Sequence, residues 1–370
     1  MLTISINLSI FKIPNNPKDK IMRVKFIICF LSIILFSSCK NEAKVDPVKA
    51  NYLDFSKRDD QLTGGIKMIP ITTQKGNFKV WTKTVGNNPT IKVLLLHGGP
   101  GLTHELYECF DGYFPNESIE YIYYDQLGSY YSDQPTDSSL WTNERFVEEV
   151  EQVRIALGLD NSNFYILGQS WGGILAMEYA LKYQKNLKGL IISNMMASVP
   201  EYNKYAKDVL APQLDPKVLK ELQDIEAKND FENPRYSELL FKNYYTQHIL
   251  RMPLEEWPES INRCFKHINP SVYVYMQGPS EFGITGNATL KNWDVKSRLK
   301  TIRVPTLSIG SKYDTMDPEH MKWIANEVQN GRFLFCPNGS HLSQYDDPKH
   351  YFPGVIKFLK DVDSGTFKKG

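Results

Sequence analysis

Three residues with the chemistry of a nucleophile, an acid and a base follow one another along the chain: Ser170, Asp314 and His341. Ser170 is the centre of Gly168-Gln169-Ser170-Trp171-Gly172, a G-x-S-x-G pattern between an apolar run and a run with helical spacing. A serine at a sharp strand-to-helix turn, a nucleophile elbow, presents its hydroxyl at a helix N-terminus, where free N–H groups favour developing negative charge. The pattern therefore predicts a nucleophile at Ser170.

Asp314 and His341 each come shortly after a predicted strand, which places both where loops leave the C-terminal edge of a parallel sheet. A serine hydroxyl is a weak nucleophile and needs a base beside it. The order serine, acid, histidine fits a triad built on such an elbow. We therefore expect His341 to be the base and Asp314 to orient it. The remaining histidines are interpreted as structural: His97, His104, His248, His267, His320 and His350.

Acyl transfer also needs hydrogen-bond donors for the oxyanion. The N–H of Trp171, directly after the nucleophile, is one expected donor. The other should come from His97-Gly98-Gly99-Pro100-Gly101, the loop after a buried strand, because glycines let the backbone approach a substrate oxygen closely.

The elements that must position these residues alternate between strand and helix. Strands are expected at 66–85 (two antiparallel strands broken near 75–77), 91–96, 119–124, 164–167, 187–193, 305–310 and 332–336, and helices at 146–157, 173–183, 319–329 and 351–362. This alternation predicts an α/β fold, a mostly parallel central sheet flanked by helices. It is interrupted by residues 197–292, a helical insertion that we interpret as a cap between two parts of the core, 57–196 and 293–370.

The N-terminus is predicted to be a targeting segment. Arg23 and Lys25 precede an apolar run at 26–36, too short to span a bilayer comfortably, and Cys39 follows. Residues 35–39 resemble a bacterial lipobox, which implies cleavage before Cys39, lipidation of that cysteine, and an exported protein anchored on the periplasmic or cell-surface face of a membrane. A plain secretory signal and an uncleaved anchor are the alternatives. We expect residues 1–39 to form the leader and residues 40–56 to form a tether. Within the leader, residues 1–21 would be an over-extended start that precedes the conventional signal.

Composition narrows the class of protein. The formal net charge is +1 and no basic run with interleaved aromatics occurs, which argues against a nucleic-acid partner. Beyond the leader, Cys109, Cys264 and Cys336 give no even disulfide set and no metal-ligand spacing. We expect these thiols to be buried small hydrophobes, and we expect no metal and no cofactor.

Three motifs carry a family resemblance. His97-Gly98-Gly99-Pro100-Gly101, residues 168–173 and Asp125-Gln126-Leu127-Gly128 resemble the proline iminopeptidase family, which comprises serine aminopeptidases of the α/β-hydrolase fold. The resemblance runs from about residue 76 to 359. It implies Ser170 as nucleophile, Asp314 as orienter, His341 as base, Gly99 and Trp171 as oxyanion donors, and a helical cap that forms the substrate pocket.

The segment 278–282 within the cap resembles the tricorn-interacting aminopeptidase branch, and this resemblance implies that Glu281 binds the free α-amino group of the substrate. A semi-buried carboxylate holds a cationic amine well. Two departures stand out: Thr315 occupies a position where that branch can carry a second acid, with Asp317 the next acid, and Tyr130-Tyr131 replace small residues.

These observations predict a serine aminopeptidase that releases N-terminal residues, proline among the candidates, from short peptides through an acyl-enzyme. An esterase or amide hydrolase with the same triad is the alternative, and a non-catalytic surface binding protein on a hydrolase scaffold is a third. The cap aromatics are left open as pocket walls or cap core: Tyr202, Phe231, Tyr244, Trp257 and Phe282.

Overall fold

The computed structural model describes residues 52–56, 58 and 60–370. The predicted leader, the lipidation site at Cys39 and most of the 40–56 tether therefore lie outside the described residues. Tyr52, near the end of the predicted tether, is buried, and its hydroxyl donates to the carbonyl oxygen of Ile119 at 3.2 Å. The chain is thus already in contact with the core at this point.

Eight strands of the described chain form one sheet in the order β1-β2-β4-β3-β5-β6-β7-β8. Only the β1–β2 and β2–β4 pairs within it are antiparallel. The strands are β1 (Ile66–Thr73), β2 (Gly76–Val85), β3 (Lys92–Leu96), β4 (Glu120–Asp125), β5 (Phe164–Gln169), β6 (Gly189–Ser193), β7 (Thr306–Ser311) and β8 (Gly331–Cys336). The mostly parallel sheet predicted from the sequence is confirmed.

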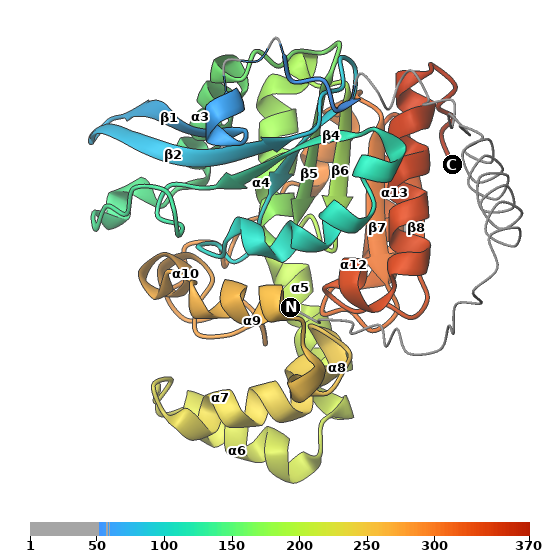
Figure 1. Cartoon of the computed structure of the whole chain (residues 1–370). Helices are drawn as coiled ribbons and strands as arrows, with labels where there is room; N and C mark the ends of the chain where they lie inside the picture. The colour runs from blue at the N-terminus through green and yellow to red at the C-terminus, as the bar shows by residue number, and fades with distance from the viewer. Residues whose placement is uncertain (1–51, 57, 59) are drawn as a thin grey trace, which may run out of the picture. The chain divides into compact units, whose positions relative to one another are not determined.

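Helices cover both faces of this sheet (Figure 1). In β3, Leu94 and Leu96 pack with the helices α3 (Asn143–Ala156), α4 (Trp171–Tyr183) and α11 (Pro318–Glu327). The alternate residues Val93 and Leu95 pack with the 3-10 helix η2 (His104–Gly112) and α13 (Pro348–Asp363). Because residues 93–96 of β3 are all buried, this part of the strand is a continuous apolar run. The short helices of the core are η1 (Gln61–Thr63), η3 (Pro115–Glu117), η4 (Ser138–Leu140), η5 (Gln184–Asn186), η10 (Lys296–Thr301) and α12 (Ser343–Asp346).

Two helices begin three residues earlier than predicted, α3 because of its N-cap and α13 because of a proline in its first turn. The Thr142 hydroxyl accepts a hydrogen bond from the Arg145 N–H at 3.3 Å and so starts α3 at Asn143. Pro348 starts α13, because proline is favoured in the first turn, where its missing N–H costs nothing.

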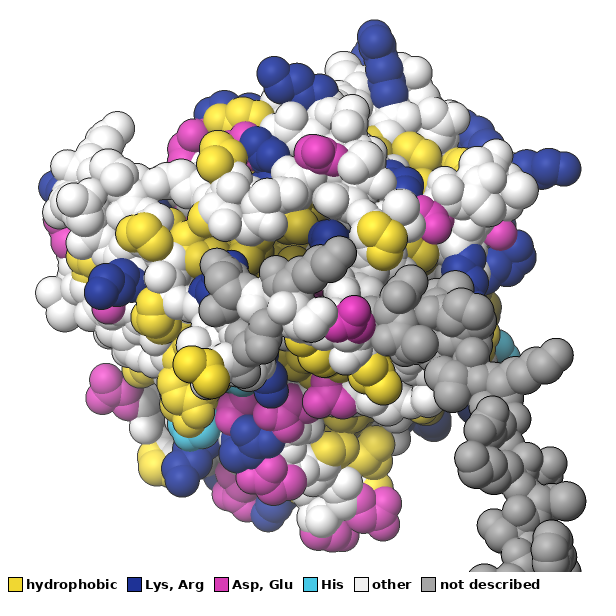
Figure 2. All heavy atoms as spheres, turned by 45° about the horizontal axis from the view of Figure 1, so that its top comes forward, with side chains coloured by type: hydrophobic (Ala, Val, Ile, Leu, Met, Phe, Trp, Pro, Cys, Tyr) yellow, Lys and Arg dark blue, Asp and Glu magenta, His cyan; other side chains and the backbone are white. Residues whose placement is uncertain are grey.

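A helical cap follows β6 and precedes β7, and it lies at one end of the sheet (Figure 1). Its elements are α5 (Val199–Tyr205), η6 (Ala206–Leu210), η7 (Ala211–Gln213), α6 (Pro216–Glu226), α7 (Pro234–Leu240), η8 (Phe241–Tyr245), α8 (Thr246–His248), η9 (Leu254–Glu256), α9 (Glu259–Lys266) and α10 (Pro270–Met276). η6 and η8 are π-helical turns, a rare geometry that is frequent at functional sites. Acidic and basic side chains lie close together in the lower part of the face shown in Figure 2, where Figure 1 has the cap.

Within the described chain, no helix is both long and apolar enough to cross a membrane, and no group of three or more His, Cys, Asp or Glu could hold a metal ion. Cys264 and Cys336 are buried free thiols as expected, whereas Cys109 is only half-buried.

Candidate active site

Ser170 occupies the turn between β5 and α4 with φ 57° and ψ −127°, a conformation that non-glycine residues rarely adopt. The residues two positions before and two positions after Ser170 must be small. A Cβ atom on Gly168 would lie 2.0 Å from the Gly172 carbonyl oxygen, and one on Gly172 would lie 1.9 Å from the Leu96 carbonyl oxygen. The glycines of the G-x-S-x-G pattern thus allow α4 to start directly against β3.

Asp314 and His341, which follow β7 and β8, form a buried pair. Nδ1 of His341 is 2.7 Å from Oδ1 of Asp314. Nε2 of the same ring is buried and has no hydrogen-bond partner among the described residues, while Ser170 and His341 line one cavity. A neutral imidazole that donates from Nδ1 leaves the Nε2 lone pair available for a proton.

The charge of His341 is set by its acidic neighbours. Burial favours the neutral imidazole, but the negative charges of Asp314 and Glu281 outweigh burial, so the pKa of His341 lies above its ordinary value. The imidazolium that forms when the ring accepts a proton is therefore stabilised in place.

Asn194, directly after β6, is a site residue that sequence reasoning missed. Its amide Nδ2 donates to Oδ2 of Asp314 at 2.7 Å and to the Ser311 hydroxyl at 3.0 Å. Its Oδ1 accepts from the hydroxyls of Ser193 and Ser343. No short pattern marks this asparagine; only the adjacency of β6 and β7 in the sheet brings it to Asp314.

The glycine-rich loop 97–101 lies beside the nucleophile. A Cβ atom on Gly98 would be 3.0 Å from the Ser170 Cβ, and Gly99 has φ +108° and lines the cavity. The main-chain N–H groups of Gly99 and Trp171 donate no hydrogen bond to any residue that the structure describes. Both are therefore free to serve as oxyanion donors.

Gln126 fixes this loop against the elbow. Its Nε2 donates to the His97 carbonyl oxygen at 3.0 Å, and its Oε1 accepts from the Trp171 indole N–H at 2.9 Å. The backbone N–H of Gln126 donates to Nε2 of His97, whose pKa is lowered to about 4 mainly by burial. A neutral His97 thus serves as a structural acceptor, in agreement with its predicted structural role.

The cavity above Ser170 is mostly apolar and small. Its free volume is about 30 Å³, above the roughly 10–15 Å³ that a cavity needs to hold one water molecule. Its lining residues are Gly99, Leu102, Leu106, Gln169, Ser170, Ile249, Ile261, Cys264, Phe265, Ile268, Tyr273, Glu281, His341 and Leu342.

Glu281 is the one carboxylate in this lining, and it is 8% exposed. Burial raises its pKa, while the nearby His341 and a hydrogen bond from Tyr273 act in the opposite direction. The carboxylate forms no salt bridge with a described side chain. A buried carboxylate without a cation is a strong site for one supplied by a ligand.

The residues at which the sequence departs from the family pattern, Thr315 and Tyr130-Tyr131, lie in different parts of the structure. Thr315 is buried, and its hydroxyl lies 3.1 Å from His341 Nδ1 and 3.3 Å from Asp314 Oδ1. Tyr130 stacks on His267 of the cap at 4.1 Å between ring centroids, and Tyr131 lies 5.3 Å from Trp81. Neither tyrosine lines the cavity: Tyr130 joins the cap to the core, and Tyr131 packs on core residues.

Asp317 and the cap aromatics, which the sequence also singled out, do not line the cavity. Asp317 caps α11 by accepting from the Glu319 N–H at 2.9 Å. The cap aromatics left open as pocket walls or cap core do not line the cavity and pack in the hydrophobic clusters instead. They are Tyr202, Phe231, Tyr244, Trp257 and Phe282.

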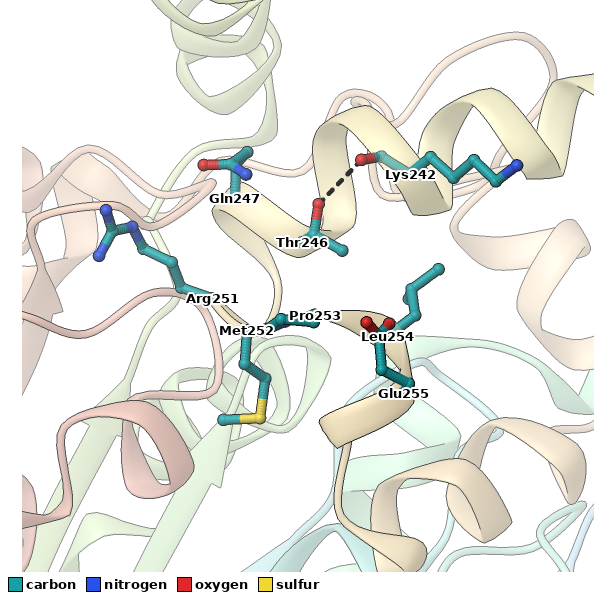
Figure 3. A pocket seen from close by; sticks show the side chains of 8 residues that line it. All are labelled: Lys242, Thr246, Gln247, Arg251, Met252, Pro253, Leu254 and Glu255. Carbon is teal, nitrogen blue, oxygen red and sulfur yellow. Dashed lines mark hydrogen bonds between the residues drawn. The ribbon is translucent and has the colours of Figure 1, made fainter.

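A second, larger hollow of about 570 Å³ lies on the cap surface (Figure 3). It is lined by Lys242, Thr246, Gln247, Arg251, Met252, Pro253, Leu254 and Glu255. No member of the Ser170, Asp314 and His341 set reaches it, so the candidate active site is the smaller cavity.

Comparison with known proteins agrees with this geometry. The family model described as the alpha/beta hydrolase fold matches residues 92–348. Proline iminopeptidase of Elizabethkingia meningoseptica is 63% identical over 300 residues, which is 81% of this chain and 100% of the relative. Proline iminopeptidase of Flavobacterium johnsoniae is 62% identical over 296 residues, 80% of this chain and 98% of the relative.

Among solved structures, proline iminopeptidase of Mycobacterium smegmatis is similar with a TM-score of 0.71 and 27% identity, over 81% of this chain and 99% of that chain. The extent of these matches, together with the fold and the motifs around Ser170, assigns the chain to a family. It belongs to the proline iminopeptidases, serine aminopeptidases of the α/β-hydrolase fold.

Proposed function

We propose that this enzyme removes one N-terminal residue, with proline preferred, from short peptides. The observation that carries the proposal is the position of Glu281, a buried carboxylate without a cationic partner in the described chain, in the same cavity as Ser170 and His341. The α-ammonium group of a peptide would supply the missing positive charge one residue from the scissile bond. A blocked N-terminus would leave Glu281 uncompensated, so exopeptidase specificity follows.

The first half of the proposed reaction forms an acyl-enzyme on Ser170. Ser170 Oγ attacks the carbonyl carbon of the N-terminal residue while Nε2 of His341 accepts the hydroxyl proton. Asp314 orients the ring through Nδ1 and stabilises the imidazolium. The main-chain N–H groups of Gly99 and Trp171 stabilise the oxyanion.

The remaining steps release both products. His341 returns the proton to the leaving amine as the peptide bond breaks, which leaves the N-terminal residue as an ester on Ser170. Water, deprotonated by His341, then attacks this ester, and Ser170 recovers its proton as the free amino acid departs.

Two observations support proline as the preferred residue. The curated relatives that are 54–63% identical are all named proline iminopeptidase. The walls beside Ser170 are apolar, among them Leu102, Ile261 and Phe265, and the free space is small. A compact apolar ring fits such a pocket better than a long or charged side chain.

The test is hydrolysis of the naphthylamides of proline, alanine and leucine, compared with N-acetylated copies and a p-nitrophenyl ester. We expect cleavage of the free-amine substrates, fastest for proline, and none of the acetylated copies. Ser170→Ala should lower kcat by about 1,000-fold or more and abolish fluorophosphonate labelling while the circular dichroism spectrum stays unchanged. Cleavage of the ester alone would indicate an esterase and contradict the proposal.

We propose further that the enzyme acts outside the cytoplasm as a lipoprotein anchored through Cys39. The support is the sequence of the leader, since Cys39 lies outside the described residues. Mass spectrometry of the mature N-terminus should find a diacylglyceryl cysteine, and Cys39→Ala should move the protein from the membrane to the soluble fraction. An unmodified N-terminus upstream of residue 39 would rule out this processing.

A further inference from the structure

The segment that carries Glu281 is held by tyrosine hydroxyls from four separate elements of the cap. The Tyr202 hydroxyl, on α5, donates to the Glu281 carbonyl oxygen at 2.7 Å, and the Tyr245 hydroxyl, on η8, accepts from the Glu281 N–H at 3.1 Å. Tyr236, on α7, shares a hydrogen bond of 3.1 Å with the Ser280 hydroxyl. The backbone at Glu281 is therefore fixed on both sides of the residue.

The fourth tyrosine reaches the carboxylate itself. The Tyr273 hydroxyl donates to Oε1 of Glu281 at 2.5 Å, and the Gln277 amide lies 3.5 Å from Oε2. Tyr273 and Gln277 are one turn apart at the end of α10, so a single helix end supplies both donors. Tyr273 also lines the cavity that contains Ser170 and His341.

We propose that Tyr273 is the positioning residue of the amine site: its hydroxyl keeps the Glu281 carboxylate ionised and turned toward the substrate ammonium group. This inference rests on the proposed role of Glu281 as the amine anchor. It adds a residue that no motif of the family resemblance above contains.

The electrostatics of the site explain why such a donor is needed. Burial raises the pKa of Glu281, and the Tyr273 hydrogen bond opposes that shift. The pKa of Tyr273 itself is raised well above its ordinary value, mainly by burial, so the shared proton stays on the tyrosine. The titratable groups that interact with Glu281 are Tyr202, Tyr244, Tyr245, Tyr273 and His341. None of these tyrosines is charged at neutral pH, so the Tyr273 hydroxyl stabilises the carboxylate from the cap side, next to the larger effect of His341 from the core.

The experiment compares Tyr273→Phe with Glu281→Gln and with Tyr275→Phe, a matched change on the same helix at a residue that is 40% exposed. Each purified variant is assayed on proline naphthylamide and on p-nitrophenyl acetate, which has no amine. For Tyr273→Phe we expect KM for the naphthylamide to rise about 10- to 100-fold, the usual effect of losing a hydrogen bond to a charged group, with kcat less affected. Ester hydrolysis should stay within about twofold of the parent enzyme, as should both activities of Tyr275→Phe.

The pH profile supplies a second readout. Amine binding requires ionised Glu281, and loss of the Tyr273 hydroxyl raises the pKa of that carboxylate further. The acid limb of kcat/KM for the naphthylamide should therefore move to higher pH in Tyr273→Phe. The acid limb for the ester depends on His341 and should stay in place or move to lower pH, because a less ionised Glu281 raises the pKa of His341 less.

The outcomes separate this inference from the proposed function. If Glu281→Gln impairs ester and naphthylamide equally, the amine anchor itself is wrong. If Glu281→Gln impairs the naphthylamide selectively and Tyr273→Phe matches the parent enzyme, the anchor stands and the role of Tyr273 is overturned. Equal loss of both activities in Tyr273→Phe would assign Tyr273 to the fold alone and would also overturn it.

Discussion

Asn194 and His341 bind opposite oxygens of the same carboxylate: the Asn194 amide is 2.7 Å from Oδ2 of Asp314, and Nδ1 of His341 is 2.7 Å from Oδ1. With a donor on each oxygen, the carboxylate cannot rotate away from the imidazole. Asn194 itself has φ 53°, a left-handed conformation that asparagine tolerates better than most residues. The backbone conformation of Asn194 and its side-chain amide thus both help to orient Asp314.

We predict that Asn194→Gly lowers kcat about 10-fold on ester and peptide substrates alike and leaves KM nearly unchanged, since the amide acts through Asp314 and not on the substrate. Glycine adopts φ 53° without strain, so this variant removes the side chain alone. Asn229 has the same φ of 53° on the exposed cap surface, which makes Asn229→Gly the matched control. Steady-state kinetics of both variants test this prediction, and an unaltered kcat in Asn194→Gly would show that Asp314 needs no donor on Oδ2.

A second prediction concerns pH. The charge of Glu281 helps to raise the pKa of His341, which must be neutral to act as a base. Glu281→Gln removes that charge, so the pKa of His341 falls and the acid limb of kcat/KM for p-nitrophenyl acetate moves to lower pH. Glu226→Gln, at another cap carboxylate whose pKa is raised by burial, is the control and should leave the limb in place. A limb that moves upward, or not at all, in Glu281→Gln would mean that the two groups are not coupled.

The sequence predicts Ser170, Asp314 and His341 because each is marked locally. Ser170 has its glycines, whose missing side chains make room for neighbouring backbone, and the other two come just after buried apolar strands. Parallel strands deliver their following loops to one edge, so local marks are enough to assemble the set.

Asn194 and Tyr273 could not be predicted in this way. An asparagine after a strand is ordinary, and its partner is fixed only by β6 lying beside β7. Tyr273 is one of many cap tyrosines, and the packing of short cap helices decides which of them faces Glu281. Hydrophobic periodicity assigns a helix face to the interior but does not say which neighbour it meets.

The elbow glycines lead to a prediction about stability. Gly172→Ala would place a methyl group 1.9 Å from the Leu96 carbonyl oxygen, in a strand that cannot retreat because it is paired on both sides. We expect the free energy of unfolding to fall by about 3 kcal/mol or more. Gly112→Ala, where no atom lies within 4 Å of the new methyl group, should change it by less than about 0.5 kcal/mol. Urea denaturation of the two variants measures the difference, and equal midpoints would contradict the steric account.

A last prediction concerns how α9 is held over the cavity. This helix contributes Ile261, Cys264 and Phe265 to the cavity lining. Arg263 of the same helix forms salt bridges with two carboxylates of η2, Glu105 and Glu108, the second at 2.6 Å. These ion pairs oppose movement of α9 away from η2 and so help to fix the part of the lining that α9 contributes.

Arg263→Met should lower the free energy of unfolding by about 1–3 kcal/mol. Glu105 is 1% exposed and would lose its full cationic partner, although the 34% exposure of Arg263 makes the loss smaller than for a fully buried pair. Hydrogen exchange at the α9 amides should accelerate in this variant, since the helix loses its attachment to η2. Adding Glu105→Gln removes the unpaired charge and should restore part of the stability, because a neutral amide costs less to bury than a lone carboxylate. If the double variant is less stable than Arg263→Met, Glu105 holds α9 through His267, whose Nδ1 is 2.9 Å away, and not through Arg263.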